Sequence, residues 1–332
     1  MSAAAPRVAV VGVGHFGRHH ARIWAEMPDV ELVGVVDADA ARAAEVARRH
    51  GVEVLPSTDV LPGLVDAVSV AVPTEHHLRV AGPLLDRGVH CLIEKPLAST
   101  SGEGRELIDR AAKGGAIVSV GHVERFNPVV LAARKHDIVP MFIESHRIHP
   151  FSFRSVDVGV VLDIMIHDLD LILSLAGAMP ERVEAVRVPV LSRSEDICNA
   201  RLTFPNGCVA NVTASRVAMK TLRRLRIFSR DAYISMDFGE RHGVLYKKSP
   251  KLSVEYVESL RDDVKDLTDL RGMVFGNLLT MENLTFDGDA DPLTMELADF
   301  IAAIREGRRP EVTGEDGLRA VELAERILEV SA

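Results

Sequence analysis

The sequence lacks the features that mark zinc proteins and redox proteins. Its three cysteines, Cys91, Cys198 and Cys208, are widely spaced along 332 residues and form no Cys-x-x-Cys pair. A structural zinc site or a dithiol is therefore not expected, and no other metal site is indicated. We expect three buried, reduced thiols.

Long apolar runs are also missing. No run approaches the roughly 20 residues that a membrane-spanning helix needs. Residues 1–7 contain no apolar segment of the kind found in secretory signals, so we expect a cytoplasmic protein with no membrane partner. The net charge of -9 argues against broad attraction to nucleic acid, although an anionic small molecule could still bind through local arginine or lysine.

The first 37 residues carry a strand, glycine turn, helix, strand, acid pattern. An apolar run at 7–11 leads into Gly12-Val13-Gly14-His15-Phe16-Gly17, a helical stretch follows, and a second apolar run ends at Asp37. In such a unit the first glycine permits a tight turn, the second lets the backbone approach a pyrophosphate, and the third lets helix and strand pack closely. A phosphate-free turn is the alternative, and the surrounding pattern favours a dinucleotide site.

Asp37 selects between the two common dinucleotides. It lies 20 residues after Gly17, where a carboxylate can accept hydrogen bonds from ribose hydroxyls. It would repel the 2′-phosphate of NADP, so the predicted cofactor is NAD. Arg42 is nearby but belongs to the next predicted helix.

Strands and helices continue to alternate as far as residue 121, which predicts an α/β fold with a parallel, doubly wound sheet. The carboxyl ends of such strands face the ligand crevice. The candidate cofactor contacts are therefore Gly12, Gly14, His15, Phe16, Gly17, Asp37, Pro73, Thr74, His77, Glu94 and Lys95. For His77 alone, a histidine on a helix surface is the simpler interpretation.

The stretch Glu94-Lys95-Pro96 ends one of these strands. Pro96 cannot donate to a sheet and holds Lys95 in extended backbone, so the strand stops here. Lys95 is then aimed at the crevice; the alternative is a surface lysine at a strand end.

The pattern changes after Gly121. We expect a dinucleotide-binding Rossmann domain at 1–122, an α+β substrate and oligomerisation domain with an open, mainly antiparallel sheet of about six strands at 123–310, and a C-terminal helix at 311–332 that packs back on the first domain. No helix or strand is assigned to residues 258–290, for which an insertion and a mobile arm are alternative interpretations.

Residues 160–172 are apolar almost all round and predict a buried helix. Asp163 and His167 are spaced i, i+4 on one face, and Asp170 follows His167 at i, i+3. Buried carboxylates and imidazoles need partners. A polar pair that satisfies itself and a catalytic histidine held by Asp163 are equally compatible with this pattern.

Together these motifs resemble the glucose-fructose oxidoreductase / inositol dehydrogenase / rhizopine-catabolism family. The resemblance is carried by the glycine turn, Asp37, Glu94-Lys95-Pro96 and Asp163-x-x-x-His167. It implies an N-terminal dinucleotide-binding domain and a C-terminal α/β domain whose open sheet mediates homodimer or homotetramer contacts. It also implies that Lys95, Asp163 and His167 form the catalytic group.

Runs at 120–128, 162–170 and 208–216 are similar to the branch of this family that oxidises UDP-N-acetylglucosamine at C3 for diamino-sugar synthesis in the lipid A pathway. The implied partner is a nucleotide-sugar substrate. Candidate substrate contacts are His122, Glu124, Arg125, Arg154 and Arg216. Forked guanidinium donors suit a diphosphate, although a structural or surface role is the simpler interpretation for each arginine taken alone.

The roles implied for an NAD-dependent dehydrogenase follow from the chemistry. His167, with a reference pKa near 6.5, is the expected base, Asp163 would orient its ring, and Lys95 would stabilise negative charge on the reacting oxygen. Glu94 would position Lys95 or contact the cofactor. Two alternatives stay open: a dehydrogenase of a free cyclitol or hexose, and a non-catalytic dinucleotide-binding regulator.

Overall fold

The computed structural model describes residues 4–151, 158–249, 279–286 and 291–330. The chain forms two compact units, each of which is described here by itself. The first unit comprises residues 1–126, 169–171 and 290–329, and the second comprises 127–168, 172–289 and 330–332. The three-part domain division expected from the sequence stays a prediction.

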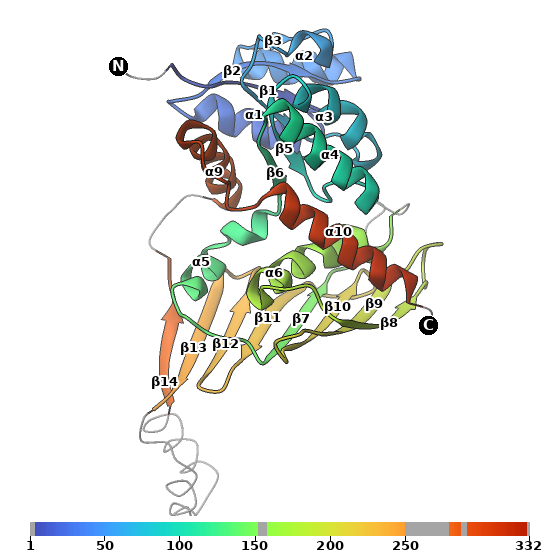
Figure 1. Ribbon diagram of the computed structural model, residues 1–332, viewed down its shortest axis with the longest axis vertical. Helices are drawn as coiled ribbons and strands as arrows, with labels where there is room; N and C mark the ends of the chain where they lie inside the picture. The colour runs from blue at the N-terminus through green and yellow to red at the C-terminus, as the bar shows by residue number, and fades with distance from the viewer. Residues whose placement is uncertain (1–3, 152–157, 250–278, 287–290, 331–332) are drawn as a thin grey trace, which may run out of the picture. The chain divides into compact units, whose positions relative to one another are not determined.

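The first unit is built on a six-stranded sheet with the order β3-β2-β1-β4-β5-β6 (Figure 1). Every neighbouring pair is parallel, which confirms the predicted doubly wound sheet. The strand order reverses between β1 and β4, so a ligand crevice is expected at the carboxyl ends of these two strands. The strands are β1 (Arg7–Val11), β2 (Glu31–Val36), β3 (Glu53–Val54), β4 (Ala67–Val70), β5 (His90–Glu94) and β6 (Val118–Gly121).

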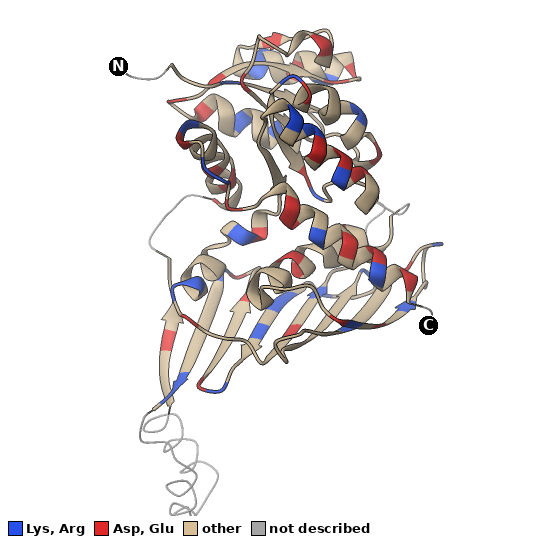
Figure 2. Ribbon diagram, viewed as in Figure 1, with Lys and Arg blue, Asp and Glu red and all other residues tan. Residues whose placement is uncertain are grey.

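Helices of the first unit pack in two groups. α1 contacts both α2 and α9, whereas α4 contacts both α3 and α10. α4 and α10 carry charged residues of both signs, which Figure 2 shows along both ribbons. The elements are α1 (Gly17–Glu26), α2 (Ala40–His50), η1 (Thr58–Val60), η2 (Thr74–His76), α3 (His77–Leu85), α4 (Ser101–Gly114), η3 (Val123–Phe126), α9 (Pro292–Glu306) and α10 (Gly314–Glu329).

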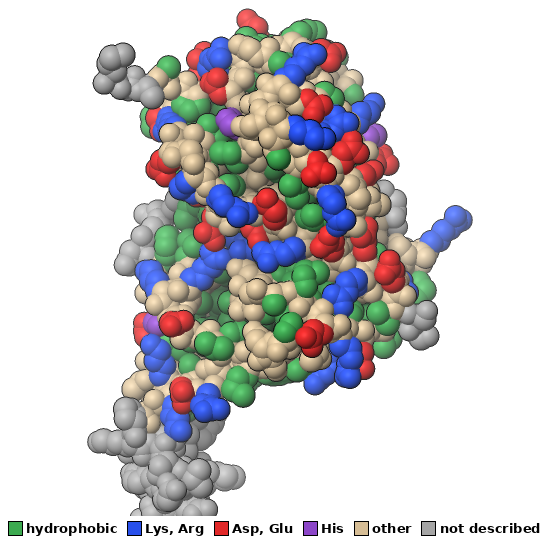
Figure 3. All heavy atoms as spheres, in the orientation of Figure 1, with side chains coloured by type: hydrophobic (Ala, Val, Ile, Leu, Met, Phe, Trp, Pro, Cys, Tyr) green, Lys and Arg blue, Asp and Glu red, His purple; other side chains and the backbone are tan. Residues whose placement is uncertain are grey.

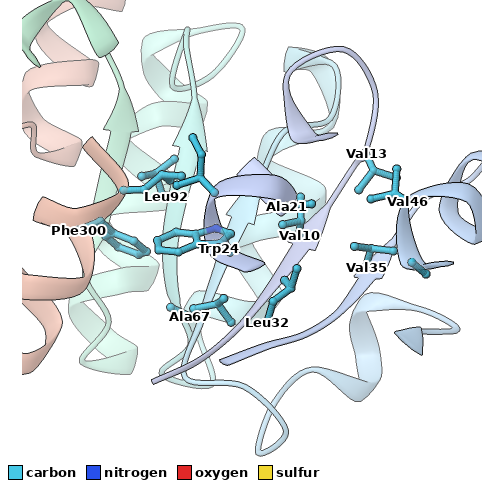
Figure 4. Packing of buried hydrophobic residues seen from close by; sticks show 14 of the residues in the cluster. Val10, Val13, Ala21, Trp24, Leu32, Val35, Val46, Ala67, Leu92 and Phe300 are labelled. Atoms are coloured by element: carbon cyan, nitrogen blue, oxygen red, sulfur yellow. The ribbon is translucent and has the colours of Figure 1, made fainter. Parts of the chain in front are cut away.

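The core of the first unit is centred on the single tryptophan. Trp24 on α1 is fully buried, and its indole N–H donates to Ser69 Oγ of β4 at 2.9 Å. Figure 4 shows it beside Phe300 of α9 and Leu92 of β5, in one cluster with the apolar residues of β1 and β2. This packing fixes α1, and therefore the glycine turn before it, on the sheet.

The second unit contains an eight-stranded sheet with the order β14-β13-β12-β11-β7-β10-β9-β8. All neighbouring pairs are antiparallel except β7 with β10, which confirms a mainly antiparallel sheet. Residues 205–207 form the hairpin turn predicted between β9 and β10, with Gly207 at φ +84°. The strands are β7 (Phe142–Ile148), β8 (Arg182–Val188), β9 (Ile197–Thr203), β10 (Val209–Ser215), β11 (Leu222–Phe228), β12 (Ala232–Asp237), β13 (His242–Lys248) and β14 (Leu279–Leu284).

β14 lies in the stretch to which the sequence assigned no element. Only its last residue is buried, so it is an exposed edge strand without the alternation that marks a half-buried one. The helical elements of this unit are α5 (Pro128–Arg134), the π-helix η4 (Val161–Met165) and α6 (Ile166–Ala176). α5 packs on β12, β13 and β14, and η4 packs on β10.

Over the face seen in Figure 3, basic and acidic side chains are interspersed. Among the described residues, no helix is both long and apolar enough to cross a membrane.

Candidate active site

The glycine turn is held together by backbone contacts that leave no room for side chains. A Cβ on Gly17 would lie 1.7 Å from the Gly12 carbonyl oxygen, and a Cβ on Gly12 would lie 2.8 Å from the Ala71 carbonyl, at the end of β4. Gly12 also has φ +85°, a conformation that side chains rarely adopt. Both glycines are thus required for α1 to begin directly behind β1.

Gly14 differs, because the space beside it is open. A Cβ there would meet one atom within 4 Å, the Nη1 of Arg42 at 3.6 Å. The turn leads into the N-terminus of α1, the positive end of the helix dipole, which favours an anion. Open backbone at a helix N-terminus fits a pyrophosphate, so these residues fit the dinucleotide expected from the motif. The predicted contacts His15 and Phe16 are exposed in the same turn.

Asp37 is fixed by two backbone donors. Val13 N–H donates to its Oδ2 at 2.8 Å, and Asp39 N–H donates to its Oδ1 at 2.8 Å. The side chain is only 8% exposed. Each oxygen keeps a further lone pair, so the carboxylate can still accept from two ribose hydroxyls.

His77 is buried, so the interpretation as a helix-surface histidine is wrong. Its Nδ1 lies 3.1 Å from both the Pro96 and the Leu97 carbonyl oxygens, and its Nε2 lies 3.0 Å from the Val72 oxygen. Burial lowers the pKa of His77 despite these carbonyl contacts. The ring therefore ties the segment after β4 to the segment after β5. Of the other two predicted contacts here, Pro73 precedes η2 and Thr74 begins it.

Glu94 is the last residue of β5, and Lys95 follows it. Glu94 Oε1 lies 2.9 Å from Nε2 of the fully buried His20 on α1, and Lys95 N–H donates to Glu94 Oε2 at 3.3 Å. Burial raises the pKa of Glu94, but the hydrogen bond with His20 and the charges of His20 and Lys95 outweigh it, so the pKa lies below its usual value. An ionised Glu94 thus joins the helix behind the glycine turn to the backbone that carries Lys95. Sequence reasoning missed His20, although it falls on the buried face of an amphipathic helix.

A second group of buried polar residues surrounds the end of β6. Arg125 forms a forked ion pair with Asp170, with Nε to Oδ2 at 2.6 Å and Nη2 to Oδ1 at 2.8 Å. His122 is 1% exposed, and burial lowers its pKa. Arg125 and His122 were predicted substrate contacts; the structure places the guanidinium of Arg125 on a buried carboxylate of its own chain. Glu124, in η3, is half-buried.

Glu296 on α9 belongs to the same buried surroundings and was missed by the sequence. It is 1% exposed, and neither carboxyl oxygen has a hydrogen-bond partner within the described residues. Burial raises its pKa well above the usual value, and the neighbouring carboxylates of Glu94 and Asp170 raise it further.

In the second unit, Asp163 lies within η4 and His167 in the first turn of α6. The region is a helix as predicted, but it begins as a π-helix, in which the turn is wider than in an α-helix. Between residues 161 and 170 the half-buried side chains are Leu162, Asp163 and His167, and the rest are buried. The two candidate catalytic side chains are thus accessible positions in an otherwise buried segment. π-helical turns occur frequently at functional sites.

Arg216 was predicted to contact substrate, and the structure places it in a buried ion pair. Its Nε donates to Asp196 Oδ1 at 2.6 Å, and its Nη1 donates to the Val158 carbonyl oxygen at 2.9 Å. The side chain is 2% exposed. The remaining predicted arginine, Arg154, lies outside the described residues.

Comparisons with known proteins agree with this geometry. Residues 6–122 match an oxidoreductase family with an NAD-binding Rossmann fold, and residues 152–332 match the C-terminal alpha/beta domain of that oxidoreductase family. UDP-N-acetylglucosamine 3-dehydrogenase of Acidithiobacillus ferrooxidans is 38% identical over 319 residues, which cover 96% of this chain and 95% of that protein. scyllo-Inositol 2-dehydrogenase (NAD(+)) of Bacillus subtilis is 29% identical over 232 residues, covering 64% of this chain and 68% of that protein.

Two solved structures are similar to this chain over nearly its full length. A structure of the Acidithiobacillus ferrooxidans enzyme superposes with a TM-score of 0.85 at 36% identity, covering 97% of this chain and 96% of that chain. Levoglucosan dehydrogenase in complex with NADH has a TM-score of 0.81 at 20% identity, covering 98% of this chain and 96% of that chain, which shows a shared fold.

Proposed function

The chain belongs to the glucose-fructose oxidoreductase / inositol dehydrogenase / rhizopine-catabolism family of NAD-binding oxidoreductases, and from this premise we propose that it oxidises the 3-hydroxyl of UDP-N-acetylglucosamine to the 3-keto sugar. The observation that carries the substrate is the 38% identity to a UDP-N-acetylglucosamine 3-dehydrogenase along nearly the full length of both chains. A shorter and weaker match to an inositol dehydrogenase supports a free cyclitol as the second candidate.

The first unit supplies the cofactor site. When bound, NAD accepts the hydride that leaves the sugar carbon. The turn at 12–17 would hold the pyrophosphate, since Gly14 leaves its backbone open, and Asp37 would accept from the adenosine ribose.

We assign the proton chemistry to three residues on the strength of the family resemblance. His167 takes the proton of the sugar hydroxyl, and Asp163 orients the imidazole. Lys95 donates a hydrogen bond to the reacting oxygen and stabilises the negative charge that develops there. Glu94, fixed by His20, positions the backbone of Lys95.

We also propose a homodimer or homotetramer that forms through the second unit's sheet. This is supported by β8, where Val186 and Val188 are 58% and 40% exposed at the sheet edge. A cytoplasmic location is supported by the free, buried state of Cys91, Cys198 and Cys208.

The substrate is tested with purified protein, NAD and a panel of UDP-sugars, free hexoses and cyclitols, followed by absorbance of NADH. We expect reduction of NAD with UDP-N-acetylglucosamine and competition by UDP alone. Turnover of a free cyclitol without competition by UDP would support the second candidate. Binding of NAD without turnover of any sugar would contradict both.

Lys95→Ala tests the mechanism. We expect turnover to fall by at least about 100-fold, in line with the loss of an oxyanion donor, while NADH still binds. Lys113→Ala, on the exposed surface of α4, is the matched control. Normal turnover in Lys95→Ala would remove this lysine from the mechanism.

A further inference from the structure

The segment that carries Asp163 and His167 begins against the loop between β8 and β9. Glu195, in that loop, accepts two hydrogen bonds from the start of the segment. Its carbonyl oxygen accepts from Val160 N–H at 3.0 Å, and its side-chain Oε1 accepts from Val161 N–H at 3.2 Å. The first N–H groups of a helix need acceptors from outside the helix. Glu195 supplies two of them, one from its backbone and one from its side chain.

Val161 is also the residue at which the π-helix η4 begins. Its carbonyl oxygen accepts from Ile166 N–H, at the other end of the wide turn. Asp163 lies within this turn, and its N–H donates to the Gly159 carbonyl oxygen at 3.1 Å. By holding Val161, the side chain of Glu195 therefore fixes the start of the turn that presents Asp163.

The contact of Glu195 with Val161 depends on a glycine. The three atoms nearest to a Cβ on Gly159 would all belong to the Glu195 side chain, at 1.9 to 2.3 Å. A larger residue at 159 would therefore displace that side chain. Because the clashing atoms are the far end of a flexible side chain, the carboxylate moves and the backbone does not have to. Gly159→Ala is thus a second way to break the contact, with the glutamate still present.

The other end of the segment is held by a separate contact. Asp168, which follows His167, accepts from Nε and Nη2 of Arg147 on β7, at 3.0 and 2.8 Å. The side chains of Arg147 and Asp168 are 5% and 1% exposed. This buried pair ties the backbone next to His167 to the sheet. Loss of Glu195 should therefore act on the beginning of the segment, where Asp163 lies.

We propose that Glu195 is a positioning residue of the proposed dehydrogenase: by fixing Val161, it places the carboxylate of Asp163 where that carboxylate orients the ring of His167. The inference rests on the proposed function and adds to it a residue from a loop outside the catalytic group. The effect of Glu195 on turnover passes through Asp163. It should therefore disappear when Asp163 has been removed.

The test consists of two double-mutant cycles read by kcat, with NAD and UDP-N-acetylglucosamine, or with NAD and scyllo-inositol if that is what the wild type oxidises. Glu195→Ala and Gly159→Ala should each lower kcat by about 10- to 100-fold, the upper value being the effect of a displacement of about 1 Å. Combining them should cost no more than either alone, because both break the same contact. In an Asp163→Ala background, Glu195→Ala should change kcat by less than about threefold.

Three further measurements separate positioning from a general loss of the fold. Glu195→Gln keeps an acceptor for Val161 N–H, so its kcat should stay within about threefold of that of the wild type. The dissociation constant of NADH should be unchanged in all Glu195 variants, because the glycine turn belongs to the first unit. Glu240→Ala, which removes an exposed glutamate between β12 and β13, is the matched control and should keep the wild-type kcat.

The outcomes separate this inference from the proposed function. Wild-type kcat in Glu195→Ala and Gly159→Ala would overturn the role of Glu195 and leave the proposed function intact. Equal losses with and without Asp163 would also overturn it, since they indicate a destabilised fold and not a misplaced carboxylate. Equal losses in Glu195→Gln and Glu195→Ala would do the same. A wild-type protein that oxidises neither sugar would overturn both.

Discussion

The buried pair of Arg216 and Asp196 gives the sharpest prediction, because the sequence and the structure give the arginine different roles. A substrate-binding arginine can be removed with a loss of substrate affinity alone. A buried arginine that holds a carboxylate is needed for the fold around it. We therefore predict that Asp196→Asn and Arg216→Met destabilise the second unit, and that Asp196→Asn does so more.

The asymmetry follows from what each substitution leaves behind. In Arg216→Met, Asp196 Oδ2 still accepts from the backbone N–H groups of Val190, Leu191 and Ser192, which stabilise its charge. In Asp196→Asn, the buried guanidinium keeps neutral acceptors such as Val158 O but loses the carboxylate of Asp196. Breaking a buried pair in this way costs about 3–5 kcal/mol, whereas loss of hydrogen bonds alone costs about 1–3 kcal/mol.

These costs are large against a total stability of about 5–15 kcal/mol. The double variant, Asp196→Asn with Arg216→Met, removes both partners and should be less destabilised than the sum of the single variants. The pair also predicts the acid response. Burial opposes the charge of Asp196, but the backbone donors and Arg216 hold its pKa far below the ordinary value of 3.8. The stability that the charged Asp196 contributes to the fold is therefore complete above pH 3.8 and is lost as the pH falls from there through the folded-state pKa.

The assay has to report on the second unit. The only tryptophan, Trp24, lies in the first unit, so its fluorescence does not serve. Hydrogen–deuterium exchange of peptides from β9 and β10 measures the local stability, with peptides from β1 and β4 as an internal control. Unchanged exchange in Asp196→Asn together with a raised KM for the nucleotide sugar in Arg216→Met would refute the structural role.

Two further predictions concern the first unit. Because the pKa of Glu296 is raised on folding, the wild type loses stability as the pH rises from 4.5 through the folded pKa, so the urea midpoint of Glu296→Gln should increase relative to that of the wild type between pH 5 and pH 8. The control Glu45→Gln, at an exposed position, should show no such increase. Parallel pH profiles for the wild type and Glu296→Gln would show that Glu296 ionises normally. Gly17→Ala would place a Cβ against the Gly12 oxygen and displace the turn, so NADH affinity should fall on the order of 100-fold. The control Gly51→Ala, at φ +67° with open space around it, should cost about 1 kcal/mol of stability and leave NADH binding unchanged.

The geometry of the glycine turn could be predicted from the sequence because its parts are local. Gly12, Gly14 and Gly17 act through backbone geometry within one turn, and Asp37 accepts from the N–H of Val13 in that same turn. The alternation of strands and helices also predicted the parallel, doubly wound sheet, because such connections allow few topologies. The edge strand β14 was not predicted because four of its six residues are exposed, so its sequence shows no alternation of buried and exposed positions.

The polar residues behind the site could not be predicted in the same way. His20 and Glu94 are 74 residues apart, and Glu296 comes from a helix at the far end of the chain. The amphipathic pattern of α1 places His20 on a buried face, but it does not indicate that its partner is a glutamate at the end of β5. The π-helical turn in η4 also leaves no mark, because one wider turn does not interrupt an apolar run that is buried all round.

The arginines show most clearly where residue type misleads. A diphosphate and a buried carboxylate can both accept two parallel hydrogen bonds from one guanidinium. Arg125 directs two donors at Asp170, and Arg216 directs its Nε at Asp196 and its Nη1 at the Val158 carbonyl oxygen; their side chains are 5% and 2% exposed. Whether the protein binds a UDP-sugar and which residues bind its diphosphate are therefore separate questions. Competition by UDP answers the first. The KM of Arg216→Met tests whether the buried pair of Arg216 and Asp196 separates so that the arginine can bind the diphosphate.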